Sequence, residues 1–134
     1  MPYYNVLQAK TAVASASSTL NTGNFKASNA INGDSSPANN STTRWISMGG
    51  NLGEWLQVDI GAVVRINKFI LYSGNSTDSI NITNSIRDAD FQVWQNDTWV
   101  TVGTLRNNPD NVFKSEIQLD SLTLQSNSIL SGHL

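Results

Sequence analysis

The segments A-S-N-A-I-N-G-D at positions 27–34, T-T-R-W at 42–45 and G-E-W-L-Q-V-D-I-G at 53–61 decide the fold class of this chain. In the last segment Leu56, Val58 and Ile60 alternate with polar residues, which is the two-residue period of a β-strand buried on one face. Gly61 then supplies a turn where the strand ends. The stretch therefore predicts a strand packed against a hydrophobic core.

Other parts of the chain show the same strand-like patterning, and no segment has a helical period of useful length. Gln95-Asn96-Asp97 is short enough to connect two strands as a hairpin. The strands are expected at residues 6–15, 54–60, 65–72, 89–94, 98–105 and 113–119. Short strands joined by loops rich in Asn, Gly and Pro predict an all-β sandwich.

The three opening motifs resemble those of the discoidin family, also called coagulation factor 5/8 type C, whose bacterial members include family 32 carbohydrate-binding modules. The resemblance covers about residues 5–119 of the 134. It implies a galactose-binding-domain-like jelly-roll β-sandwich, secreted or displayed at a cell surface, that binds sugars and does not cleave them.

Composition sets limits on the partners of this chain. Its length fits one domain over residues 1–134. A net charge of −2 and a pI near 5.1 provide no basic face for nucleic acid or anionic membranes. The sequence has no apolar run of about 18 residues for membrane insertion, and its first residues lack a signal-peptide pattern. We therefore expect any export signal to lie outside this sequence.

The tail over residues 120–134 departs from the family pattern, because the segment expected to form the usual last strand is not recognisable. A jelly roll that lacks a strand exposes hydrogen-bonding edges. Two alternatives follow. Either residues 122–130 replace the missing strand, or a partner chain does so and the protein forms a dimer through an unpaired strand edge.

The resemblance also implies a structural calcium site in the loop that follows position 27. Oxygen ligands suit this hard cation. Asn32 stands where the family has Asp, and the loop between Asp34 and Trp45 is longer than in the family. The alternative is an Asn-Gly turn held by side-chain hydrogen bonds without metal. Carried over by position, the candidate ligands are Asn29, Asn32, Asp34 and Thr43.

Most of the tryptophans are expected to be structural, because aromatic side chains contribute much of the burial in a small core. The resemblance implies that Trp45, Trp55 and Trp99 are core residues. Trp94 stands where the family often has Ser and alternates away from Val93. It is therefore a candidate platform for stacking a sugar ring, the alternative being a side chain that covers a neighbouring strand.

The remaining candidates for sugar contact are amide and guanidinium side chains in the loops. Asn84 matches an Asn that grips sugar hydroxyls in galactose-binding relatives, but their Arg and His have no clean equivalent, so galactose specificity is not carried over. The other candidates follow from residue type and loop placement. The set of candidate carbohydrate-binding residues is Asn75, Asn84, Arg87, Trp94, Arg106 and Asn107.

An enzyme is not expected. The chain has no cysteine and one histidine, and its only glutamates are Glu54 and Glu116, so the usual nucleophile-base pairs and zinc sites cannot be assembled. The sequence therefore predicts a noncatalytic carbohydrate-binding module whose partner is a glycan or polysaccharide. The alternative is a discoidin-type adhesion module that binds a protein or a cell surface.

Overall fold

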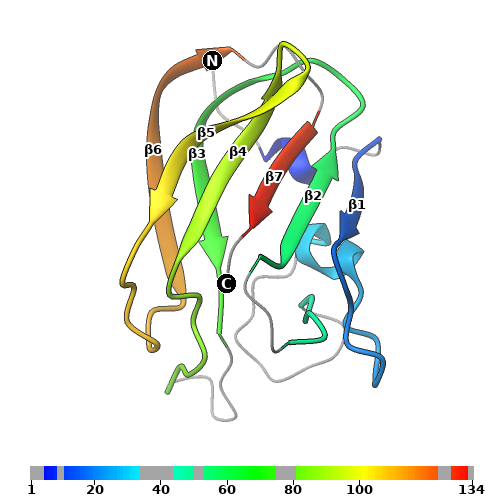
Figure 1. Cartoon of the computed structure of the whole chain (residues 1–134), viewed down its shortest axis with the longest axis vertical. Helices are drawn as coiled ribbons and strands as arrows, with labels where there is room; N and C mark the ends of the chain where they lie inside the picture. The colour runs from blue at the N-terminus through cyan, green and yellow to red at the C-terminus, as the bar shows by residue number, and fades with distance from the viewer. Residues whose placement is uncertain are drawn as a thin grey trace.

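The computed structural model describes residues 5–8, 11–33, 44–49, 53–74, 81–123 and 128–132. These residues form two antiparallel sheets that face each other, with the larger sheet in front in Figure 1. The larger sheet has the strand order β1-β2-β7-β4-β5, and the smaller sheet pairs β3 with β6. The strands are β1 (Val13–Ala16), β2 (Trp55–Asp59), β3 (Arg65–Tyr72), β4 (Ala89–Gln95), β5 (Thr98–Leu105), β6 (Lys114–Thr123) and β7 (Ser128–Gly132). The predicted all-β sandwich is confirmed.

The first expected strand, residues 6–15, is wrong in its first half. Val6–Gln8 forms the 3-10 helix η1, and only Val13–Ala16 is a strand. The Asn5 side chain accepts a hydrogen bond of 3.0 Å from the amide of Leu7, which favours a turn at this point over an extended chain. A second 3-10 helix, η2, spans Ala27–Ile31.

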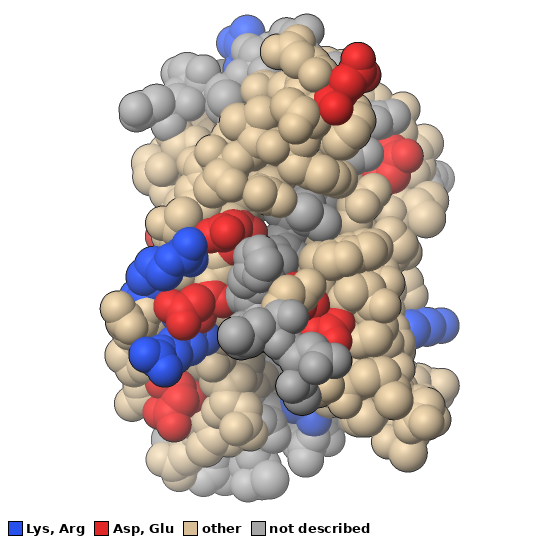
Figure 2. Space-filling model, viewed as in Figure 1, with Lys and Arg blue, Asp and Glu red and all other residues tan. Residues whose placement is uncertain are grey.

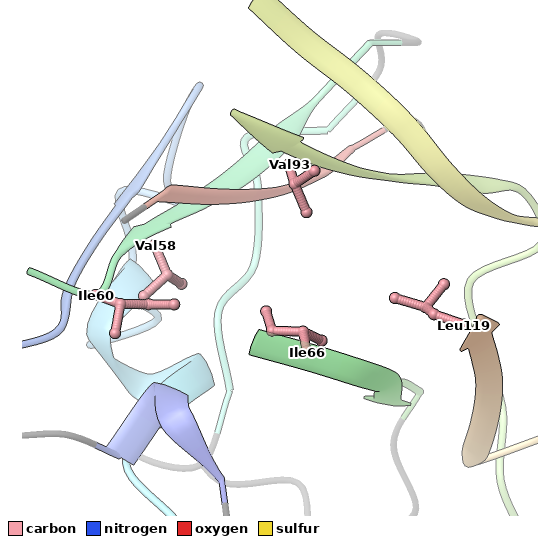
Figure 3. Close-up of a cluster of buried hydrophobic side chains, with 5 residues drawn as sticks. All are labelled: Val58, Ile60, Ile66, Val93 and Leu119. Atoms are coloured by element: carbon pink, nitrogen blue, oxygen red, sulfur yellow. The ribbon is translucent and has the colours of Figure 1, made fainter. Parts of the chain in front are cut away.

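The hydrophobic core lies between the two sheets and is mainly aliphatic. Figure 3 shows its five central side chains pointing toward one another from both layers. They are Val58, Ile60, Ile66, Val93 and Leu119. Phe91 adds an aromatic contact across the layers, with its ring centroid 5.0 Å from that of Phe69. These contacts fix the distance between the sheets and hence the positions of the loops at the ends.

The expectation that Trp55 and Trp99 belong to the core is wrong. Side chains alternate along a strand, and Val58 and Val93 face inward. Trp55 therefore lies on the outer face of β2, and Trp99, paired with Trp94 rather than with Val93, lies on the outer face of β5. Both side chains are half-buried there. Trp45, also half-buried, lies in a loop and donates its indole N–H to the carbonyl of Ser18 over 3.0 Å.

Strand β7 resolves the question that the tail of the sequence left open. It pairs antiparallel with β2 on one side and with β4 on the other, so that Gly132 lies opposite both Trp55 and Asp90. The strand that joins the two halves of the larger sheet is thus supplied by the same chain. The structure has the first alternative, with the strand over Ser128–Gly132 rather than 122–130, and the dimer stays a prediction.

Candidate functional site

Four loops meet at one end of the sandwich, which is the lower end in Figure 1. They follow β1, precede β2, connect β3 to β4 and connect β5 to β6. The β4–β5 hairpin lies at the opposite, upper end. The described parts of the four loops are residues 17–26, 44–49 with 53–54, 73–74 with 81–88, and 106–113.

The loops after β1 and before β2 form one pair, and backbone hydrogen bonds hold them together. The amide of Leu20 donates to the carbonyl of Ile46 over 2.8 Å, and the amide of Ile46 donates to the carbonyl of Phe25 over 3.2 Å. The Arg44 guanidinium lies 5.5 Å from the centre of the Phe25 ring, a cation–π distance. Burial lowers the pKa of Arg44 from its usual value. The backbone groups and the Arg44 side chain of this loop pair are therefore used mainly in contacts between the two loops.

Glu54 is an acidic side chain that joins the two loops of this first pair. Its side chain is only 8% exposed and accepts hydrogen bonds from the hydroxyls of Ser17 and Ser18. The Ser17 hydroxyl in turn accepts from the amide of Trp55 over 2.8 Å, and the Ser18 hydroxyl accepts from the amide of Met48 over 3.0 Å. The hydroxyl of Ser17, followed by that of Ser18, lowers the pKa of Glu54. The carboxylate is a structural clasp between the two loops.

We predict that Glu54 makes folding stability depend on pH in the acidic range. Because its pKa is lower in the folded protein than in the unfolded chain, its contribution is present above the unfolded pKa and is lost as pH falls through the folded pKa. Glu54→Gln should be less stable than the parent protein at pH 7, and the difference should shrink as pH falls below the ordinary glutamate pKa of about 4.3. Urea unfolding of both proteins across this range measures it. A difference that is the same at all pH values would contradict this role.

The calcium prediction lies partly outside the described residues. Asp34 and Thr43 are in the part of the chain that the structure does not describe. Asn29 is 6% exposed, and its side-chain amide donates to the carbonyls of Asn24 and Arg44. Among the described residues, no group of three or more His, Cys, Asp or Glu is placed to hold a metal. Asn29 thus serves as a hydrogen-bonding tie, Asn32 ends η2 as its C-cap, and calcium stays a prediction of the sequence.

The loops 81–88 and 106–113 form the second pair, next to the entry of β4 and the exit of β5. The amide of Asn108 donates to the carbonyl of Arg87 over 3.0 Å, and its side chain donates to the carbonyl of Ile86 over 2.9 Å. The amide of Ser85 donates to the carbonyl of Asp110 over 3.1 Å. These bonds give the second loop pair a fixed backbone.

Arg87 and Asn107 lie opposite each other on this fixed backbone. The register that pairs Ala89 with Leu105, continued by two residues on each strand, brings them together. The Arg87 guanidinium lies 3.4 Å from the side-chain oxygen of Asn107 and 3.6 Å from the Asp88 carboxylate. The Arg87 side chain is 75% exposed, and the Asn107 backbone has a left-handed φ of 53°. The amide and guanidinium are thus presented to solvent.

The other sugar-contact candidates at this end are used differently. Arg106 donates to the carbonyls of Ala89 and Leu105 and forms an ion pair with Asp90, so its guanidinium holds the start of β4. Asn84 is exposed and also has a left-handed backbone, with a φ of 61°. Asn75 lies outside the described residues. Figure 2 shows these charges of both signs gathered over the ends of β4 and β5.

Trp94 does not join this cluster. It lies at the far end of β4, where its ring centroid is 5.3 Å from that of Trp99 in an edge-to-face arrangement of 70°. Gln95 lies six positions after Ala89 along β4, a rise of about 20 Å. Trp94 therefore packs against Trp99 across the hairpin, with the Asn96-Asp97 turn between them in the sequence.

We predict that the two indoles stabilise the hairpin cooperatively. A double-mutant cycle with Trp94→Ala and Trp99→Ala should give a coupling free energy of about 0.5–1.5 kcal/mol, the usual range for aromatic pairs. Chemical unfolding of the four proteins measures this coupling. Additive effects of the two substitutions would show that the edge-to-face contact contributes nothing to stability.

Tyr72, at the end of β3, is a residue that the sequence reasoning did not single out. It is 44% exposed, and its ring centroid lies 5.4 Å from that of Phe113. The strand register places its side chain, with those of Lys68 and Ile70, on the same face as Lys114, Glu116 and Gln118. The exposed aromatic side chain thus belongs to the outer face of the β3–β6 sheet, where apolar and polar side chains lie side by side.

The sequence matches the F5/8 type C domain model over residues 13–128. The chain belongs to the F5/8 type C family. No protein of curated function matches it. Within the described residues, the structure of this F5/8 type C domain has no helix long and apolar enough to span a membrane.

Solved structures share the fold at low sequence identity. A CBM32 module from Clostridium perfringens, in complex with GalNAc-β-1,3-galactose, is 21% identical with a TM-score of 0.72, covering 96% of this chain and 87% of that one. Chitosan-binding module 1 from a Paenibacillus sp. IK-5 chitosanase/glucanase is 24% identical with a TM-score of 0.68, covering 98% and 88%. The lectin domain of Lectinolysin, complexed with Lewis B antigen, is 16% identical with a TM-score of 0.69, covering 95% and 84%. At these identities the similarity establishes the fold.

Proposed function

We propose that this F5/8 type C domain is a noncatalytic carbohydrate-binding module that grips a glycan with the second loop pair. The observation that carries the proposal is the opposed pair of Arg87 and Asn107, exposed on a backbone fixed by hydrogen bonds between the two loops. A guanidinium donates in a planar fork, and an amide both donates and accepts, as recognition of sugar hydroxyls requires.

Two further observations support a glycan. Structures of the same fold were solved with a galactose-containing disaccharide, chitotriose and Lewis B antigen. The carboxylates at the entry of β4 are engaged by the protein, since Asp90 pairs with Arg106 and Asp88 accepts from the amide of Asn107 over 3.0 Å. Asp88 and Asp90 are thus held by protein groups, an arrangement that suits binding better than hydrolysis by a pair of carboxyl groups. We also propose that the protein is secreted or displayed at a cell surface.

The proposal is tested with a glycan array on the tagged domain. Parent protein, Arg87→Ala and Arg65→Ala are compared, since Arg65 is an exposed arginine at the start of β3, at the other end of the sandwich. We expect the parent protein and Arg65→Ala to bind a defined class of glycans. Arg87→Ala should no longer bind them. Binding to an immobilised protein partner in place of any glycan would favour the adhesion alternative.

A further inference from the structure

The outer face of the β3–β6 sheet carries two rows of side chains, one from each strand. Cross-strand partners share a face, so the register places Tyr72 beside Lys114, Ile70 beside Glu116 and Lys68 beside Gln118. Ile70 and Tyr72 are 42% and 44% exposed, which is high for large hydrophobic residues. Lys68 and Tyr72 stand about 13 Å apart along the strand. The face thus has a largely apolar row of side chains on β3 beside a row of hydrogen-bonding side chains on β6.

This face is positive on a protein whose net charge is negative. Of the described side chains on it, Lys68 and Lys114 are basic and Glu116 is acidic, whereas the chain as a whole carries −2. The Lys114 ammonium lies 3.1 Å from the Glu116 carboxylate, and both side chains remain about half exposed. The pKa of Glu116 is lowered by its hydrogen bond with Lys114 and, after it, by the charge of Lys68, which lies opposite Gln118 on the neighbouring strand.

We propose that this face binds an extended polysaccharide that carries carboxylate groups, at a site that does not use Arg87 or Asn107 of the second loop pair. The exposed rings and aliphatic groups of β3 would contact the C–H faces of the sugars, and the cations would pair with the carboxylates. Side chains of a sheet face offer no main-chain pairing, which an extended peptide obtains at a sheet edge. The face therefore suits a sugar polymer better than an acidic peptide.

The test is affinity electrophoresis in native gels containing polygalacturonate, with dextran as the neutral polymer. Lys114→Gln and Glu116→Gln break the same ion pair but change the charge in opposite directions. We expect polygalacturonate affinity to fall about threefold for Lys114→Gln and to rise about threefold for Glu116→Gln, both effects shrinking with added salt. Tyr72→Ala should weaken binding about tenfold, whereas Tyr72→Phe should bind like the parent protein.

Several results would overturn the proposal. These are no retardation of the parent protein by polygalacturonate, a change of the same sign for Lys114→Gln and Glu116→Gln, and a larger effect of Tyr72→Ala on an acidic peptide than on the polymer. Arg87→Ala should retain polygalacturonate binding at this face, so a failure of the loop site and a failure of this face are distinguishable. Lys26→Gln, which removes an exposed lysine preceding η2, controls for net charge.

Discussion

Gly74→Ala is expected to destabilise the domain by about 3 kcal/mol or more, because two costs add at this position. Gly74 has a left-handed φ of 89°, and a Cβ placed there would lie 2.7 Å from the carbonyl oxygen of Thr83. Backbone cannot move away as a flexible side chain can. The same close approach positions the segment that leads to Arg87, so the substitution should also disturb the second loop pair.

A matched substitution separates the two costs at Gly74. Gly49 has a similar φ of 81°, but a Cβ there meets no atom within 4 Å. Gly49→Ala should therefore show the conformational cost alone, about 1–2 kcal/mol. Chemical unfolding of both variants measures the difference. Equal destabilisation would show that the approach of Thr83 to Gly74 does not constrain the loop.

Arg87→Ala is expected to lower the affinity for the bound glycan by tenfold or more and to leave stability nearly unchanged. A hydrogen bond from a charged donor is worth about 1.5–3 kcal/mol, and about 1.4 kcal/mol corresponds to tenfold. In the unbound protein the Arg87 side chain is 75% exposed, so its contact with Asp88 should contribute less than about 1 kcal/mol. Calorimetric titration and urea unfolding measure the two quantities.

Two comparison variants make this result specific. Arg106→Ala removes the group that holds the carbonyls of Ala89 and Leu105 and pairs with Asp90, so it should reduce stability. Asn107→Gly removes the amide but keeps a residue that accepts the φ of 53°. Asn107→Gly should therefore weaken glycan binding without strain. If Arg87→Ala lost stability and Arg106→Ala lost only affinity, the two roles would be reversed.

The sequence predicted strands from apolar runs and from alternating polarity. Residues 65–72 were predicted with the observed bounds, and the hairpin around Asn96-Asp97 was predicted as well. The position of β7 could not be predicted, because its two partners, β2 and β4, are distant in the chain and the tail carries no pattern that names them. Trp55 and Trp99 were assigned to the core by resemblance, although counting the alternation from Val58 and Val93 places both on the outer face.

The candidate site could be predicted in part, for a similar reason. Arg87 and Asn107 were chosen by residue type, and extending the hairpin register outward from its turn would have placed them opposite each other. The same count places Trp94 at the other end of β4, away from both. The hydrogen bonds of Asn108 and Ser85 that fix the two loops join residues about 20 positions apart, which a local pattern does not reveal.

The most direct test of the proposed site is a two-dimensional amide NMR titration of the domain with the oligosaccharide that the array selects. We expect the largest shift changes in residues 84–88 and 106–110, including the Asn107 side-chain amide, and none at the indole N–H groups of Trp94 and Trp99. Changes centred on the Trp94 and Trp99 indoles and the turn between them, with residues 84–88 unaffected, would contradict the account.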